Sequence, residues 1–125
     1  MKKFMLFVLF SLSVNVMAGN LTFIEAKAKA DAVEESLASP ELQKVIEAQG
    51  KVANSAFPKC INSTGSMPSD FTVVVSVDST GKVISTWRKG KSPFAKCFEN
   101  SMRQKFKYIP KIQYFYTSFE YMHET

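Results

Sequence analysis

The chain has 125 residues, two cysteines, one histidine and a formal net charge of +5, a size that supports one domain with a modest core. The histidine, His123, stands close to the C-terminus, and no His, Cys, Asp and Glu residues have the spacing of metal ligands. We therefore expect a protein that is not an enzyme and that uses neither a cofactor nor a metal ion.

Residues 1–18 are expected to be a cleaved secretory signal peptide. Lys2 and Lys3 precede an apolar run over residues 4–12, and Val16-Met17-Ala18 offers small side chains at a cleavage site. A membrane anchor is the alternative, but the apolar run is short for a stable span. We therefore expect export to the periplasm without stable membrane insertion. Two of the +5 charges leave with the signal peptide, so the mature chain carries +3.

The segment 19–56 is predicted to be helical and to form one domain with the rest of the chain. Thr22 and Glu25 have the spacing of a capping box, so a helix is expected to begin there. Strong helix formers continue to about Ala38, but the apolar side of this stretch is thin. The sequence therefore leaves open whether the first helix lies loosely or docks on the domain.

A second helix is predicted with Ser39 as its N-cap and Pro40 at its first helical position, because serine caps helices well and proline suits a first turn. Its apolar side continues to about Gly50. The next residues, 56–70, include Pro58 and Pro68, which discourage a continuous helix. We therefore expect a loop between the second helix and the first strand.

The strongest local pattern is a β-hairpin. Residues 71–78 alternate as a strand with one firmly buried face does. Asp78-Ser79-Thr80-Gly81 has the composition of a turn, with positive φ expected at Gly81. Residues 83–88 then return as the partner strand, so that the two runs form an antiparallel pair.

A helix is expected over residues 93–107, because Ser92 and the proline after it repeat the capping pattern and Pro110 ends the helix. An aromatic strand follows over residues 113–123. The module 57–125 thus contains a hairpin, a helix and a strand. The predicted fold class is α+β, with a three-stranded antiparallel sheet covered by helices.

Cys60 and Cys97 are the only cysteines, and export would bring them into an oxidising compartment. We therefore expect an intrachain disulfide. It would close a loop of about 38 residues, which in the chain-entropy model stabilises the fold by about 4 kcal/mol. Two free thiols or an intermolecular bridge are the alternatives.

Scattered motifs run through residues 57–121. They are Phe57-Pro58 before Cys60, Gly81-Lys82-Val83 in the hairpin, Ser92-Pro93-Phe94, Cys97 on the helix, and Phe106, Tyr108 and Pro110 before the last strand. This set resembles the C-terminal domain of TonB-type envelope proteins, in its two-cysteine variant. The resemblance implies this fold and a binding habit. TonB-type domains usually hang from a transmembrane anchor and a proline-rich segment, and we expect neither here, so an energy-transducing role is not implied.

Basic residues gather in residues 82–111, which hold nine lysines and arginines and one acid, Glu99. Trp87 and the cations after it combine an aromatic anchor with charge, as protein interfaces do. Trp87 fits the core equally well, and a plain solvated surface also explains the charges. Export argues against nucleic acid as the partner. The predicted partner-binding residues are Trp87, Arg88, Lys89, Lys91, Lys96 and Arg103.

Two functions fit a small exported binding protein. In architecture and address the chain is similar to periplasmic immunity proteins of type VI secretion effectors. The expected partner is then a secreted peptidoglycan hydrolase with an acidic cleft that the basic residues would complement. The alternative is an envelope accessory protein whose TonB-like module binds a membrane protein or peptidoglycan, with strand addition at the last strand. That aromatic strand also allows a homodimer.

Overall fold

The structure is a computed structural model that describes residues 21–123. The predicted signal peptide, residues 1–18, lies outside the described residues. The elements are α2 (Phe23–Ser36), α3 (Ser39–Thr64), β1 (Phe71–Val77), β2 (Val83–Lys89), α4 (Pro93–Lys105) and β3 (Phe115–Tyr121). They confirm the predicted α+β class with one three-stranded antiparallel sheet.

β1 is the central strand of the sheet, whose order is β2-β1-β3. The predicted hairpin of β1 and β2 is confirmed, with Val75 opposite Thr86 and a bulge between Ser76 and Val77. Gly81 has the expected positive φ, at 92°. A Cβ at this position would lie 3.0 Å from the carbonyl oxygen of Tyr108, so the turn requires glycine for space as well as for conformation.

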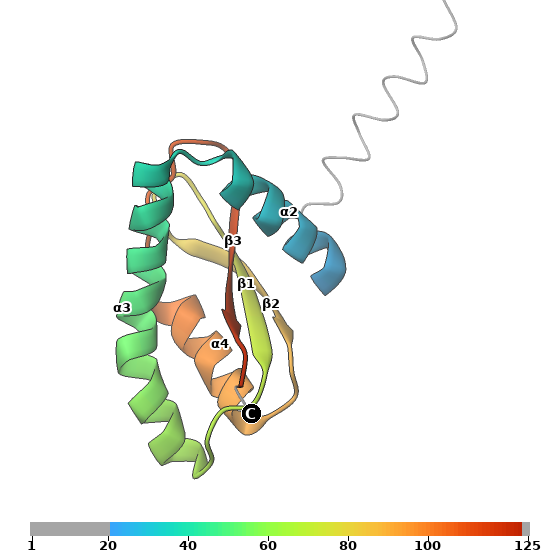
Figure 1. The fold of residues 1–125 in the computed structure, drawn as a ribbon, viewed down its shortest axis with the longest axis vertical. Coiled ribbons are helices and arrows are strands. Elements are labelled where there is room, and N and C mark those ends of the chain that lie inside the picture. Colours follow the sequence, from blue (N-terminus) through green and yellow to red (C-terminus); the bar gives the residue numbers. More distant parts are fainter. Residues whose placement is uncertain (1–20, 124–125) are drawn as a thin grey trace, which may run out of the picture.

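The two faces of the sheet are covered by different helices. Figure 1 shows α3 and α4 on one side and α2 crossing the other. The larger core lies under α3 and α4, where Phe71 and Phe98 are almost fully buried. The predicted disulfide joins α3 to α4 on this side, with 5.8 Å between the Cα atoms of Cys60 and Cys97. The disulfide therefore links the two helices that cover the larger core.

α3 corrects the loop predicted for residues 56–70. The helix continues through Pro58 to Thr64 and ends at Gly65, which has a φ of 72°. Proline removes one hydrogen bond, to the carbonyl four residues earlier at the exposed Asn54, where water can replace it. Burial at spacings of four along the same side of α3 stabilises the helix across this site. Those buried residues are Val52, Ala56 and Cys60.

α2 begins with the predicted capping box, in which the Thr22 N–H donates to Glu25 and the Glu25 N–H donates to Thr22. The structure answers the question left open by the sequence, because α2 docks on the sheet. Ala26 and Ala30 are fully buried against the sheet, because alanine lets a helix backbone approach closely. No helix among residues 21–123 has the length and apolar character needed to cross a membrane.

Candidate functional site

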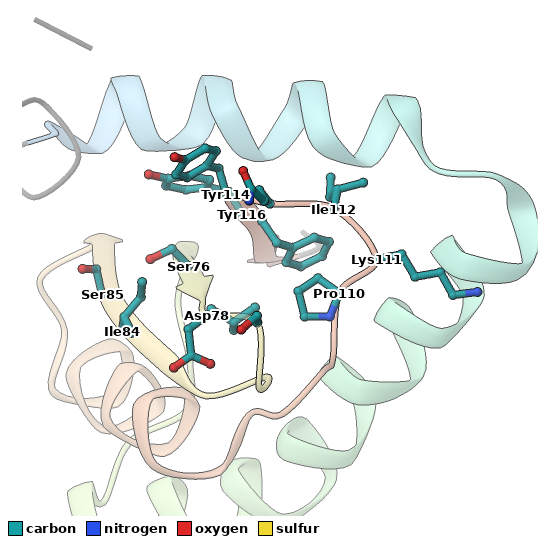
Figure 2. A pocket seen from close by; sticks show the side chains of 13 residues that line it. Ser76, Asp78, Ile84, Ser85, Pro110, Lys111, Ile112, Tyr114 and Tyr116 are labelled. Atoms are coloured by element: carbon teal, nitrogen blue, oxygen red, sulfur yellow. The ribbon is translucent and has the colours of Figure 1, made fainter. Parts of the chain in front are cut away.

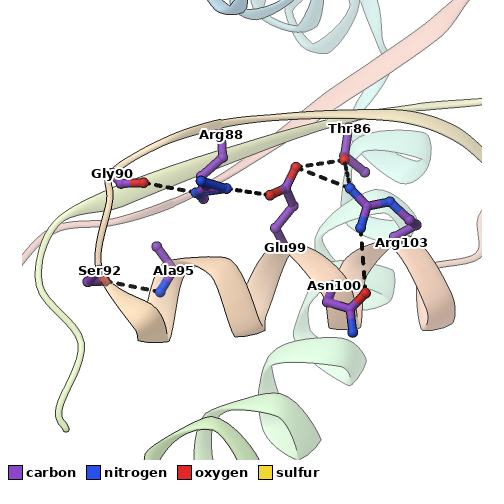
Figure 3. Close-up of polar contacts among 8 residues, drawn as sticks. All are labelled: Thr86, Arg88, Gly90, Ser92, Ala95, Glu99, Asn100 and Arg103. Atoms are coloured by element: carbon purple, nitrogen blue, oxygen red, sulfur yellow. Dashed lines mark hydrogen bonds and ion pairs between the residues drawn. The ribbon is translucent and has the colours of Figure 1, made fainter. Parts of the chain in front are cut away.

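The basic residues of β2 and α4 are organised around one carboxylate. Figure 3 shows that Arg88 donates from Nη1 to Glu99 Oε1 at 2.6 Å. Arg103 donates from Nη2 to the other oxygen of Glu99 at 3.3 Å. The Thr86 hydroxyl donates to that same oxygen at 2.7 Å. Two guanidinium groups thus share one carboxylate, and the cluster keeps a net positive charge.

The arginines of the predicted site form internal ion pairs, whereas its lysines form none among the described residues. The Arg88 side chain is 24% exposed and also donates to the carbonyl of Gly90 at 2.9 Å. Lys89, Lys91 and Lys96 are exposed. No carboxylate of the described residues forms an ion pair with any of these three lysines. Their charges are therefore available to an anionic partner without the loss of an internal contact.

The structure divides the predicted site between the two faces of the sheet. Arg88 points toward α4, so its neighbours Trp87 and Lys89 point to the face that α2 covers. Lys91 lies in the connection before α4. Lys96 lies on α4, the helix that also carries Glu99 and Arg103. The alternation of side chains along β2 accounts for this division.

Trp87 packs inside the molecule. Its Nε1–H donates to the carbonyl of Leu21 at 2.8 Å, and its ring lies 5.8 Å from that of Tyr116. Both contacts place the indole in the small core cluster under α2. Of the two interpretations left open by the sequence, the structure favours the core, and Trp87 anchors the beginning of α2 to the sheet.

The N-terminus of α4 adds to the positive potential. Ser92 caps it, since its hydroxyl accepts from the Ala95 N–H at 3.0 Å (Figure 3), and the first turn holds no acidic residue. The helix dipole places a partial positive charge at this end. Lys91 and Lys96 flank the same turn, so the strongest unneutralised charge of the predicted site lies here.

Sequence reasoning missed an apolar groove at the other end of β2. Side chains from β1, β2 and residues 110–116 surround a hollow (Figure 2), whose volume is about 520 Å³. Ile84 is 62% exposed and Tyr114 is 77% exposed along its rim. Tyr114 has a φ of 57°, a conformation that disfavours side chains larger than glycine. No periodicity of the sequence predicts this turn, because residues 111–114 lie outside the helices and strands.

A carboxylate and a phenol form the most perturbed titratable pair. Tyr108 donates a short hydrogen bond to Glu41, and Lys111 pairs with the same carboxylate at 3.2 Å. The hydrogen bond from Tyr108, helped by Lys111, lowers the pKa of Glu41 to about 2. Burial, together with Glu41, raises the pKa of Tyr108 to about 12. The pair fastens the segment before β3 to the first turn of α3.

Among residues 21–123, no three His, Cys, Asp or Glu side chains gather closely enough to hold a metal ion. No protein-family model, curated protein or solved structure matches the chain. The resemblance of residues 57–121 to TonB-type C-terminal domains is tested by none of these comparisons and stays a prediction. The structure supports the α+β class and the disulfide, which many families share.

Proposed function

We propose that this protein is a non-enzymatic binding protein of the bacterial periplasm, and that it acts as an immunity protein against a secreted effector that degrades the cell wall. The observation that carries the proposal is the unneutralised charge around the start of α4. Lys91 and Lys96 have no ion-pair partner among the described carboxylates, and Glu99 serves two arginines. A surface of this kind complements an acidic cleft.

The physical reason is electrostatic complementarity. Enzymes that cleave the glycan or peptide of the wall with carboxylates concentrate negative charge in a cleft. Opposite charge on an inhibitor accelerates association and rejects partners of the wrong sign. No described carboxylate forms an ion pair with Lys91 or Lys96. Docking of a partner therefore displaces water from these lysines and breaks no ion pair among the described residues.

The disulfide is consistent with the oxidising compartment that the proposal requires. The bond between Cys60 and Cys97 is formed, as expected of a protein in an oxidising compartment. The periplasm itself is part of the proposal, and rests on the signal peptide predicted for residues 1–18.

Contacts along the outer edge of β3 disfavour the alternative function as an envelope accessory protein that adds a strand. The Ser118 N–H donates to Glu34 at 3.1 Å, and the Ser118 carbonyl accepts from Gln49 at 2.9 Å. Side chains of α2 and α3 therefore occupy backbone groups that an added strand would need. Strand addition or homodimerisation at this edge would have to displace both contacts.

The test is a pull-down from a periplasmic extract of the source organism, followed by a wall-digestion assay on what is retained. We expect a stoichiometric partner that hydrolyses peptidoglycan and that the protein inhibits. The double variant Lys91→Glu/Lys96→Glu should weaken inhibition by about 100-fold, since it reverses two charges in the contact. Arg88 is left unchanged, because its reversal would set a second carboxylate against Glu99.

The matched control is Lys51→Glu/Lys107→Glu, which makes the same change in net charge on a different part of the surface. It should leave inhibition within about twofold of the native protein. Retention of membrane proteins or wall fragments alone would favour the accessory function instead. A hydrolase held equally well by Lys91→Glu/Lys96→Glu would keep the function and reject this surface.

A further inference from the structure

A second basic feature lies between α3 and the end of α4. It is a cleft of about 370 Å³, separate from the surface around Lys91 and Lys96. Four of the residues that line it are lysines and one is a glutamate, so the lining carries a formal charge of +3. The lining residues are Lys44, Glu47, Ala48, Lys51, Lys105, Lys107 and Tyr108.

The lysines reach this cleft from distant parts of the chain. Lys44 and Lys51 lie two turns apart on one side of α3. Lys105 is the last residue of α4, and Lys107 follows it. Phe106 and Tyr108 are buried at 3% and 8% exposure, so they fix the backbone on both sides of Lys107 and aim its side chain outward. The tertiary fold, and not a run of sequence, brings the four cations together.

Neighbouring carboxylates leave most of this charge uncompensated. Lys44 has a long contact with Glu41, at 3.4 Å, and Glu41 is already engaged by Tyr108 and Lys111. No described carboxylate, Glu47 included, forms an ion pair with Lys51, Lys105 or Lys107. The end of the α4 dipole accounts for Lys105, but it does not explain the other three lysines.

We propose that this cleft binds a phosphate-bearing anion. Four ammonium groups around one hollow repel each other, and an anion seated among them removes that repulsion. Lysine is a strong phosphate ligand as a point charge, and a concave wall of low dielectric focuses the field of several such charges. The lining also includes the small side chain of Ala48 and the buried Tyr108. A group with several charged oxygens fits this arrangement better than a single carboxylate.

The test is a titration of the secreted protein with inorganic pyrophosphate, followed by NMR chemical shifts at low salt. We expect shifts centred on the cleft residues and a Kd below about 1 mM. Citrate is the comparison anion, because it carries several negative charges but no phosphate, and it should bind at least about tenfold more weakly. Equal binding of citrate, or no shift with pyrophosphate, would overturn the proposal.

Two double variants locate the site. Lys51→Glu/Lys107→Glu should weaken pyrophosphate binding by about tenfold or more, since it removes two charge-assisted contacts. Lys91→Glu/Lys96→Glu makes the same change in net charge elsewhere and should change the Kd by less than about twofold. An equal loss in both variants would mean that net charge alone attracts the anion, and would reject the cleft. Lys51→Gln/Lys107→Gln, which keeps side-chain size, replaces the first variant if its thermal unfolding shows a loss of fold.

A second arm separates the two sources of phosphate. Vesicles of phosphatidylcholine with and without phosphatidic acid present the group on a surface, whereas pyrophosphate presents it in solution. Binding of both, lost together in the cleft variant, assigns the site to lipid headgroups as well as to free phosphates. Binding of pyrophosphate alone assigns it to free phosphates. The outcome is independent of the immunity proposal, which predicts the opposite ranking of the same two variants.

Discussion

The two faces of the sheet are covered in contrasting ways. Under α3 and α4, the Phe98 ring lies 4.7 Å from that of Phe119 and 5.2 Å from that of Phe71. Under α2, the contacts come from Ala26 and Ala30 against Val74, with Tyr116 at the side. The first face is filled by aromatic rings beneath its helices, whereas on the second face the alanines of α2 let the helix approach the sheet closely beside Tyr116 and Trp87. A small side chain in a helix is thus as informative about packing as a large one.

The central strand β1 contributes side chains to the cores on both faces of the sheet. Every residue of β1, from Phe71 to Val77, is buried. The sequence pattern predicted one firmly buried face, because alternation was visible on that side. The other face carries Thr72 and Ser76, small polar side chains that a helix can also cover. The comparison between the faces predicts different costs for matched substitutions.

The largest effect is expected on the α3 and α4 face. Phe98→Ala should lower the free energy of unfolding by about 4–5 kcal/mol, because a fully buried ring leaves a cavity and loses its aromatic neighbours. Urea unfolding measures this. Ile24→Ala, at a position that is 77% exposed, is the control and should change stability by less than about 0.5 kcal/mol. A similar loss in both variants would contradict the role of the buried ring in stabilising this face.

The disulfide should rank next. Cys60→Ala/Cys97→Ala is expected to cost about 4 kcal/mol, since it releases a long loop in the unfolded chain. Alanine avoids a buried hydroxyl at Cys60, which is fully buried. Unfolding of the native protein with and without a reductant gives the same comparison without a mutation. A loss under about 1 kcal/mol would show that packing alone holds α3 to α4.

On the α2 face, addition of bulk should be the harmful change. Ala30→Leu is expected to cost about 2 kcal/mol, because a larger side chain at a fully buried position forces α2 away from the sheet. Ala28→Leu, on the exposed side of the same helix, controls for helix propensity and should be nearly neutral. Hydrogen exchange at the Ser118 amide reports the same movement, since that N–H donates to Glu34 of α2. Unchanged exchange in Ala30→Leu would contradict close packing.

The smallest effect depends on pH and belongs to the Glu41–Tyr108 pair. The Tyr108 hydrogen bond lowers the pKa of Glu41 from 4.5 to about 2, so its contribution is present above 4.5 and is lost as the pH falls toward 2. Glu41→Gln should therefore flatten the fall of stability with acid over this range. Tyr108→Phe removes the donor and should flatten it too. A slope equal to that of the native protein in both variants would reject the linkage.

Much of the fold could be predicted from short-range patterns. The capping box at Thr22, the cap at Ser92 and the turn before Gly81 all depend on neighbours within a few residues, and the structure confirms each. The helix through Pro58 could not be predicted in this way, because its stability comes from burial of Cys60 and its neighbours against a distant core. Local chemistry discouraged that helix, and tertiary packing overrode it.

The candidate site shows the same limit. The amino-acid sequence was enough to predict that cations gather in residues 82–111, that the chain is of the α+β class and that Cys60 and Cys97 can pair. The sequence could not predict which cations lack an ion-pair partner, because ion pairing depends on which side chains the fold brings together from different elements. Glu99 pairs with arginines on β2 and on its own helix, whereas no described carboxylate forms an ion pair with Lys51, Lys105 or Lys107 of the cleft. The residue type sets the charge of a side chain, but the fold determines whether that charge has an ion-pair partner.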